Sequence, residues 1–110
     1  MRKFVVNDTF GGFGFSDDGF EYLVNSFTNE EKRKYGTDKY DVIDNIERDN
    51  AKLVAMVEKL GVNANSENSF LMVYYVPDEA TDTFMYENDG CETLLYCMDG
   101  KINYATLLPF

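Results

Sequence analysis

The spacing of apolar residues changes near Ser69. Between Phe20 and Leu60 the apolar side chains recur every three or four residues, which predicts amphipathic helices. After Ser69 they alternate or run together between turn signals, which predicts strands joined by hairpins. The length, 110 residues, is typical of one domain. We therefore expect a single α+β domain over residues 1–110, with an antiparallel sheet of about four to five strands packed on two main helices.

The helices are expected in the first half of the chain. Residues 20–27 carry four apolar side chains on one helical face, behind a cap at Ser16 or Asp17. Residues 28–31 form a capping-box pattern that begins a shorter helix ending at Gly36. The second main helix follows a cap at Asp49 or Asn50, carries its apolar stripe over residues 53–60 and ends at Gly61. Between these, residues 37–48 are expected to be a connection with a short strand or turn near 40–46.

The strands are expected at both ends of the chain. Residues 3–7 look like a buried strand that joins the main sheet. Residues 70 onward predict an antiparallel meander whose turns are marked by Asn88-Asp89-Gly90 and Asp99-Gly100. The strands of this meander are predicted at residues 70–76, 83–87, 92–98 and 101–107.

The second half of the chain is strongly acidic. The formal net charge is −10, and residues 61–110 contain eight acids but a single base, Lys101. A surface of this kind repels nucleic acid and membranes and attracts basic protein surfaces, although solubility alone would also explain it. The residues that we expect to contact a partner are Asp78, Glu79, Asp82, Tyr86, Glu87, Asp89 and Glu92.

The composition argues against an enzyme. Histidine is absent, which removes the commonest general base and metal ligand. Two cysteines do not make a zinc site, which needs about four nitrogen or sulfur ligands. We therefore expect no catalytic residue, no metal and no cofactor.

The cysteines and the termini indicate the compartment. Cys91 and Cys97 are six residues apart in one expected strand, a separation of about 20 Å. A disulfide needs Cα atoms within about 7 Å, so free thiols are expected, as in intracellular proteins. We find no apolar run of membrane-spanning length and no signal-peptide core, so no membrane association is expected.

A glycine-rich loop lies between the first strand and the first helix. Residues 10–16 read Phe-Gly-Gly-Phe-Gly-Phe-Ser, a position that suits an anion at a helix N-terminus. Its candidate ligand-binding residues are Gly11, Gly12, Phe13, Gly14 and Ser16. The spacing is not that of a P-loop or a dinucleotide fingerprint, and Asp17-Asp18 would repel an anion. The alternative interpretation is a tight turn that lets the phenylalanines reach the core.

The first strand and this loop also carry a resemblance. Lys3-x-Val5-Val6-Asn7, followed by Gly11-Gly12-Phe13-Gly14-x-Ser16, resembles a group of small phage and prophage proteins. Those proteins open with Lys-x-Val-Ile-Asn and then Gly-Gly-Phe-Gly-Leu-Ser. Further similarity lies in residues 46–50, 53–61, 64–65, 76–78 and 86–90. Members of the group end in a basic, Trp-containing tail, whereas this chain ends in Leu107-Leu108-Pro109-Phe110. The resemblance implies a phage or prophage origin and the cytoplasm of a bacterial host.

Two function classes follow. The first is a small acidic interaction protein, similar to the anti-CRISPR inhibitors of phages. It would bind a host protein with a basic surface, such as a CRISPR or other defence nuclease, by placing carboxylates where nucleic-acid phosphates bind. The second is a small-ligand protein that holds a nucleotide signal at the glycine-rich loop. The apolar C-terminal run needs cover, which is compatible with a homo-oligomer.

Overall fold

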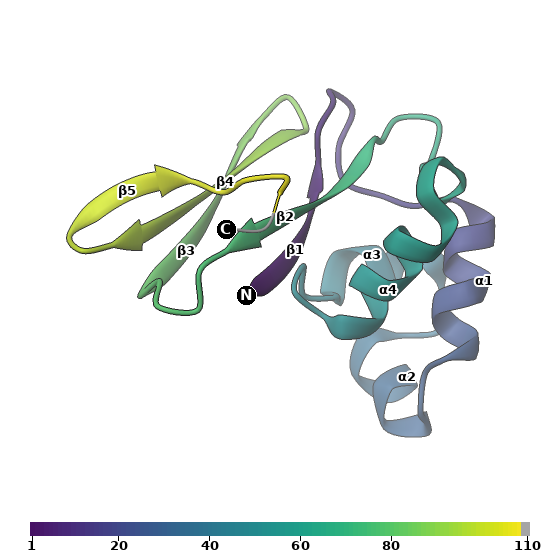
Figure 1. Ribbon diagram of the computed structural model, residues 1–110. Helices are drawn as coiled ribbons and strands as arrows, with labels where there is room; N and C mark the ends of the chain where they lie inside the picture. Colours follow the sequence, from purple (N-terminus) through teal and green to yellow (C-terminus); the bar gives the residue numbers. More distant parts are fainter. Residues whose placement is uncertain (109–110) are drawn as a thin grey trace.

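A computed structural model describes residues 1–108, so Pro109 and Phe110 of the apolar C-terminal run lie outside the described residues. Four helices gather on one side of the molecule, and the three C-terminal strands project from the other (Figure 1). The elements in chain order are β1 (Arg2–Asn7), α1 (Asp17–Asn25), α2 (Asn29–Tyr35), α3 (Lys39–Asn45), α4 (Ala51–Leu60), a 3₁₀ helix η1 (Gly61–Ala64), β2 (Leu71–Val76), β3 (Asp82–Asn88), β4 (Cys91–Met98) and β5 (Lys101–Tyr104).

The predicted α+β class with antiparallel pairing is confirmed, but the strands form two sheets. β1 pairs only with β2, and β3, β4 and β5 form the expected meander. Within the described residues, one bridge, Tyr75 with Thr106, joins the two sheets. The expected single sheet of four to five strands is therefore not confirmed among the described residues.

The division into two sheets arises because β1 lies between two cores. Val5 belongs to the core that the helices form, whereas Phe4 and Val6 belong to a second core with Leu94 and Tyr96 of β4. Successive side chains of a strand point to opposite faces. The β1–β2 sheet is therefore a middle layer, covered by helices on one face and by the three-stranded sheet on the other.

The caps of the predicted helices are largely as expected. The Ser16 hydroxyl caps α1, and Thr28 with Glu31 forms the complete capping box of α2. The Asn50 side chain caps α4 by accepting hydrogen bonds from two backbone N–H groups. The prediction of a connection at residues 37–48 is wrong: α3 occupies most of it.

The helix α3 forms because it has its own cap and its own buried residue. The side chain of Asp38 accepts a hydrogen bond from the Tyr40 N–H at 2.8 Å, and Val42 is fully buried in the helical core. With α2 and α3 added to the two longer helices, the expectation of two main helices is not confirmed. No helix among residues 1–108 is long and apolar enough to cross a bilayer.

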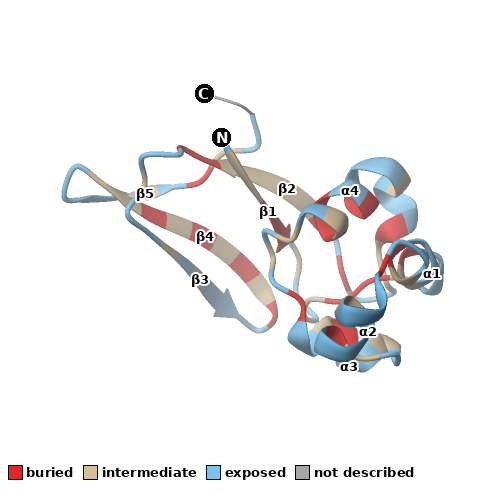
Figure 2. Cartoon of the chain, turned by 90° about the horizontal axis from the view of Figure 1, so that it is seen from below, coloured by how far each residue is buried: buried red, intermediate tan, exposed pale blue. Residues whose placement is uncertain are grey.

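Burial differs sharply between the two sides of the molecule. Figure 2 shows buried residues inside the helical group and as alternating bands along β4, whereas β3 is almost entirely exposed or intermediate. Among residues 1–108, the rest of the chain therefore covers one face of the three-stranded sheet and not the other.

Candidate functional site

The acidic residues predicted to contact a partner lie mainly at the two ends of β3. Asp78 and Glu79 are exposed in the β2–β3 turn, and Asp82 begins the strand. Glu87 and Asp89 are exposed at the opposite end, about 20 Å away by strand rise. Asp78 also accepts a hydrogen bond from the N-terminal ammonium group at 3.0 Å. The acids therefore form two separate ends, not one continuous surface.

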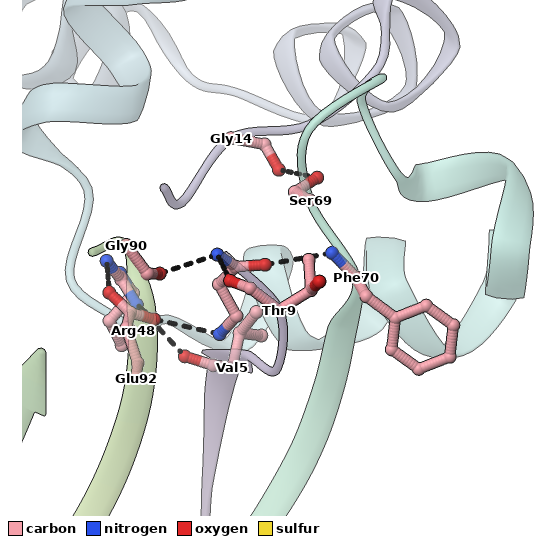
Figure 3. Close-up of polar contacts among 9 residues, drawn as sticks. Val5, Thr9, Gly14, Arg48, Ser69, Phe70, Gly90 and Glu92 are labelled. Carbon is pink, nitrogen blue, oxygen red and sulfur yellow. Dashed lines mark hydrogen bonds and ion pairs between the residues drawn. The ribbon is translucent and has the colours of Figure 1, made fainter. Parts of the chain in front are cut away.

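Glu92 does not belong to this surface, which corrects its place among the expected contact residues. Its side chain is 6% exposed and accepts two hydrogen bonds from the Arg48 guanidinium, the longer at 2.6 Å. It also accepts a hydrogen bond from the Asn7 N–H at 2.8 Å. This carboxylate forms an internal ion pair with Arg48, which joins the helical side of the molecule to β4 (Figure 3).

Arg48 and Asn7 complete a polar cluster around this ion pair. The Arg48 guanidinium lies 3.5 Å from the centroid of the Phe13 ring and also donates to the Val5 carbonyl. The fully buried Asn7 side chain donates to the carbonyls of Thr9 and Gly90 and accepts from the Phe70 N–H. No buried side-chain polar atom in the described residues lacks a partner.

The uncovered face of the three-stranded sheet is the most distinctive surface of the molecule. We call it the outer face. Residues directly opposite one another in an antiparallel ladder share a face, so the register assigns to it Asp82, Phe84, Tyr86, Asn88, Cys91, Thr93, Leu95, Cys97, Ile102 and Tyr104.

This outer face is apolar and almost uncharged. Asp82, at its edge, is its one charged member among the described residues. Phe84, Tyr86, Ile102 and Tyr104 are 43%, 64%, 67% and 73% exposed. Burying residues of this size is a large driving force in folding and association, so a contiguous exposed group of them typically marks an interaction surface.

Sequence reasoning found Tyr86 but missed Phe84, Leu95 and Ile102. The alternation of β4 and β5 contains apolar residues on both faces, because Leu94 and Tyr96 fill the core while Leu95 faces outward. Deciding between the faces requires knowing which one packs on β1. Tyr86, among the expected contact residues, was the one member of this apolar group that the sequence indicated.

The glycine-rich loop packs closely against the β3–β4 turn. The Gly11 N–H donates to the Asp89 carbonyl at 3.0 Å. A Cβ atom on Gly90 would lie 2.1 Å from the Gly12 nitrogen, and one on Gly11 would lie 2.6 Å from the Asn68 carbonyl oxygen. Both glycines have positive φ angles. These contacts support the interpretation of the loop as a structural turn.

A cavity of about 740 Å³ nevertheless opens beside this loop, lined by residues 11–17, by α3 and by residues 65–68. Its charged lining residues are Asp17, Asp44, Glu67 and Lys39. The Lys39 ammonium donates to the Asp17 carboxylate at 2.7 Å, which raises the pKa of Lys39 above its ordinary value. An anionic ligand in this cavity would therefore meet mainly carboxylates, and the one cation there, Lys39, is already paired with Asp17.

Ser16, the remaining candidate ligand residue, is also occupied internally. Its hydroxyl oxygen accepts from the Gly19 N–H at 3.0 Å, and the hydroxyl donates to the Asn63 carbonyl at 2.6 Å. In the same region the Ser69 hydroxyl donates to the Gly14 carbonyl at 2.8 Å (Figure 3).

No cluster of residues suited to a metal ion lies within residues 1–108. Comparison with family models, with curated proteins and with solved structures finds no match for the chain. The arguments about function therefore come from the surface itself.

Proposed function

We propose that this chain is a phage-encoded interaction protein. It binds a host nucleic-acid-acting or defence protein, in the manner of an anti-CRISPR inhibitor, through the outer face and the acidic ends of β3. The main supporting observation is the arrangement of this surface: an uncharged aromatic centre, with Asp82 at one end of the strand and the exposed Asp89 in the turn at the other.

This arrangement has the anatomy of a protein interface. Interface centres are depleted of charge and enriched in aromatic residues, and their rims are polar. Tyrosine is among the residues that contribute most to binding when it is buried by a partner. Tyr86 and Tyr104 are both more than half exposed on the outer face, so both are available as anchors.

The charges favour a partner whose own rim is basic. Asp78, Glu79 and Asp82 lie at one end of β3, with Glu87 and Asp89 at the other. Proteins that bind nucleic acid carry lysine and arginine along the path of the phosphates. The proposed partner is therefore a protein whose basic channel borders an apolar patch, and the inhibitor occupies that channel inside the host cell.

The test is a photo-crosslinking experiment followed by reconstitution. A benzoylphenylalanine is placed at Tyr86, and a matched probe is placed at Tyr40, which is 69% exposed on α3. We expect a host protein that crosslinks from position 86 and not from position 40. With the purified partner, the unmodified chain should inhibit nucleic-acid binding, and Tyr86→Ala should weaken that inhibition at least tenfold, as for a binding hot spot. Equal crosslinking from both positions, or a partner whose nucleic-acid binding is unaffected, contradicts the proposal.

The second candidate function is a ligand site at the glycine-rich loop, which the cavity supports. Its carboxylate lining opposes a nucleotide, because phosphates there would meet Asp44 and Glu67. Thermal unfolding with a panel of nucleotides separates the two functions, since a bound ligand raises the melting temperature and an unbound one does not.

A further inference from the structure

We propose that β3 is in addition a pairing edge for a second copy of this chain, with a two-fold axis passing beside Met85. The resulting dimer would join two three-stranded sheets into one continuous sheet. This inference does not depend on the proposed host partner, because it follows from the backbone edge of β3.

The first step is that β3 is a regular edge strand. It lies at one end of the order β3-β4-β5 and pairs with β4 without a break from Asp82 to Asn88. It contains no proline, and its outer side lies along the margin of the molecule in Figure 2. An exposed edge of this length is a template for another strand.

The second step identifies which backbone groups face outward. The Ala105 N–H donates to the Leu94 carbonyl, so the Leu94 backbone faces β5. Along a central antiparallel strand the backbone groups face alternate neighbours. The Leu95 backbone therefore faces β3, and so its partner Phe84 faces β4.

It follows that the N–H and C=O groups of Thr83, Met85 and Glu87 point away from the sheet. Within residues 1–108, no hydrogen bond from these backbone groups to a turn, loop or other element is present. They form an unused ladder along the edge.

The third step is that this ladder is self-complementary. When Met85 lies opposite the partner's Met85, Thr83 lies opposite the partner's Glu87, and all of the outward groups are paired. On the outer face, Phe84 then lies opposite the partner's Tyr86, and this pair occurs twice. Aromatic cross-strand pairs are among the stabilising pairs of antiparallel sheets.

The charges in this register do not oppose a second copy as the occupant. Asp82 lies opposite the partner's Asn88, and Glu87 lies opposite the partner's Thr83, so no carboxylate directly faces another. At about 0.15 M salt, the net negative charge of each copy is screened beyond about 8 Å. The dimer also places two outer faces side by side, which doubles the apolar surface that one host protein could meet.

The experiment measures the oligomeric state of the full chain by sedimentation velocity over a concentration series. We expect a monomer–dimer equilibrium. Asn88→Lys places a lysine opposite the partner's Asp82 twice and should tighten the dimer about fivefold, whereas Asn88→Asp should weaken it by a similar factor. Asn88 is exposed, so neither variant disturbs the core.

Two controls make the result specific. Asn25→Lys and Asn25→Asp change the net charge equally at an exposed position on α1, far from β3 in Figure 1, and should leave the equilibrium nearly unchanged. Thr83→Pro removes one outward N–H, and an edge strand tolerates proline at such a position. This variant should abolish the dimer and leave the circular dichroism spectrum unchanged.

Three results overturn the inference: a monomer at every concentration, a dimer that survives Thr83→Pro, or Asn88 variants that behave like those at Asn25. In the dimer Tyr86 lies beside the partner's Phe84, so a crosslink from position 86 to a second copy is scored separately from a crosslink to a host protein. Loss of the dimer leaves the host crosslink and the inhibition assay in place, so the failure of the dimer and the failure of the host-partner proposal are distinguishable.

Discussion

The ion pair between Arg48 and Glu92 is the place where a single substitution should most strongly affect stability. Glu92→Ala removes a carboxylate that is 6% exposed and leaves Arg48, 23% exposed, without its partner. It also leaves the buried Asn7 N–H without its side-chain acceptor. The substitution therefore isolates one charge and one polar group in the same place.

The size of the effect follows from these two losses. Removing one member of a buried ion pair costs about 3–5 kcal/mol. For Arg48 the cost should be at the lower end of this range, because water still reaches part of its side chain. An unsatisfied buried N–H adds at least about 1 kcal/mol. We expect Glu92→Ala to lower the free energy of unfolding by about 4 kcal/mol, a large share of the 5–15 kcal/mol typical of a domain.

The assay is urea unfolding followed by circular dichroism, because the chain has no tryptophan to report by fluorescence. Glu92→Gln keeps an acceptor for the Asn7 N–H and should cost less than Glu92→Ala. The double variant Arg48→Met with Glu92→Leu should recover part of the loss, since it removes both charges together. Glu58→Gln breaks the exposed pair with Lys3 and is the matched control, with little effect expected.

The reasoning is refuted if Glu92→Ala changes the unfolding free energy no more than Glu58→Gln does. It is also refuted if the double variant is less stable than Glu92→Ala alone by the full cost of a second independent loss. The latter result would mean that the two side chains do not act as a pair.

Two further predictions concern the loop and the helices. Gly90→Ala forces a Cβ atom to within 2.1 Å of the Gly12 nitrogen and should lower the free energy of unfolding by at least about 3 kcal/mol. The control is Gly100→Ala, which is also at positive φ but in open space and should lower it by about 1 kcal/mol. Thermal or urea unfolding measures both. The hydrogen bond from the Tyr35 hydroxyl is the main cause that lowers the pKa of Glu47 below its ordinary 4.5, so its contribution is present above pH 4.5 and is lost as the pH falls through the lowered pKa. Tyr35→Phe should therefore reduce stability at neutral pH by about 1 kcal/mol and flatten the acid limb of the stability curve, and an unchanged acid limb would contradict the assignment.

The helices predicted from sequence are those whose boundaries are marked locally. Thr28 and Glu31 form the capping box through their own side chains, and Asn50 and Gly61 bound α4. The helix α3 has the same kind of cap at Asp38, but it buries a single residue, Val42. With so few buried positions, no apolar period identifies a helix, and packing on the core decides the structure.

The division into two sheets depends on contacts that are distant in sequence. The apolar run at residues 4–6 correctly indicates a buried strand, because both of its faces are covered. It does not indicate which strand lies beside it. Glu92 is a parallel case: its partner Arg48 is 44 residues away, and nothing in the local sequence separates it from the exposed Glu87.

The glycine-rich loop and the outer face are connected through the same polar cluster. Asn7 binds the Gly90 carbonyl and Glu92 binds the Asn7 N–H, so the turn between β3 and β4 is held to β1 by hydrogen bonds at both positions. Because the loop also contacts that turn through Gly11, its glycines allow the close approach on which the orientation of the three-stranded sheet depends. The loop is rich in glycine because its close backbone packing leaves no room for a Cβ atom at Gly11. The outer face consists of ordinary strand residues, distinguished only by the side of the strand on which they lie. A change in the loop would therefore alter the orientation of this face and not the residues that form it.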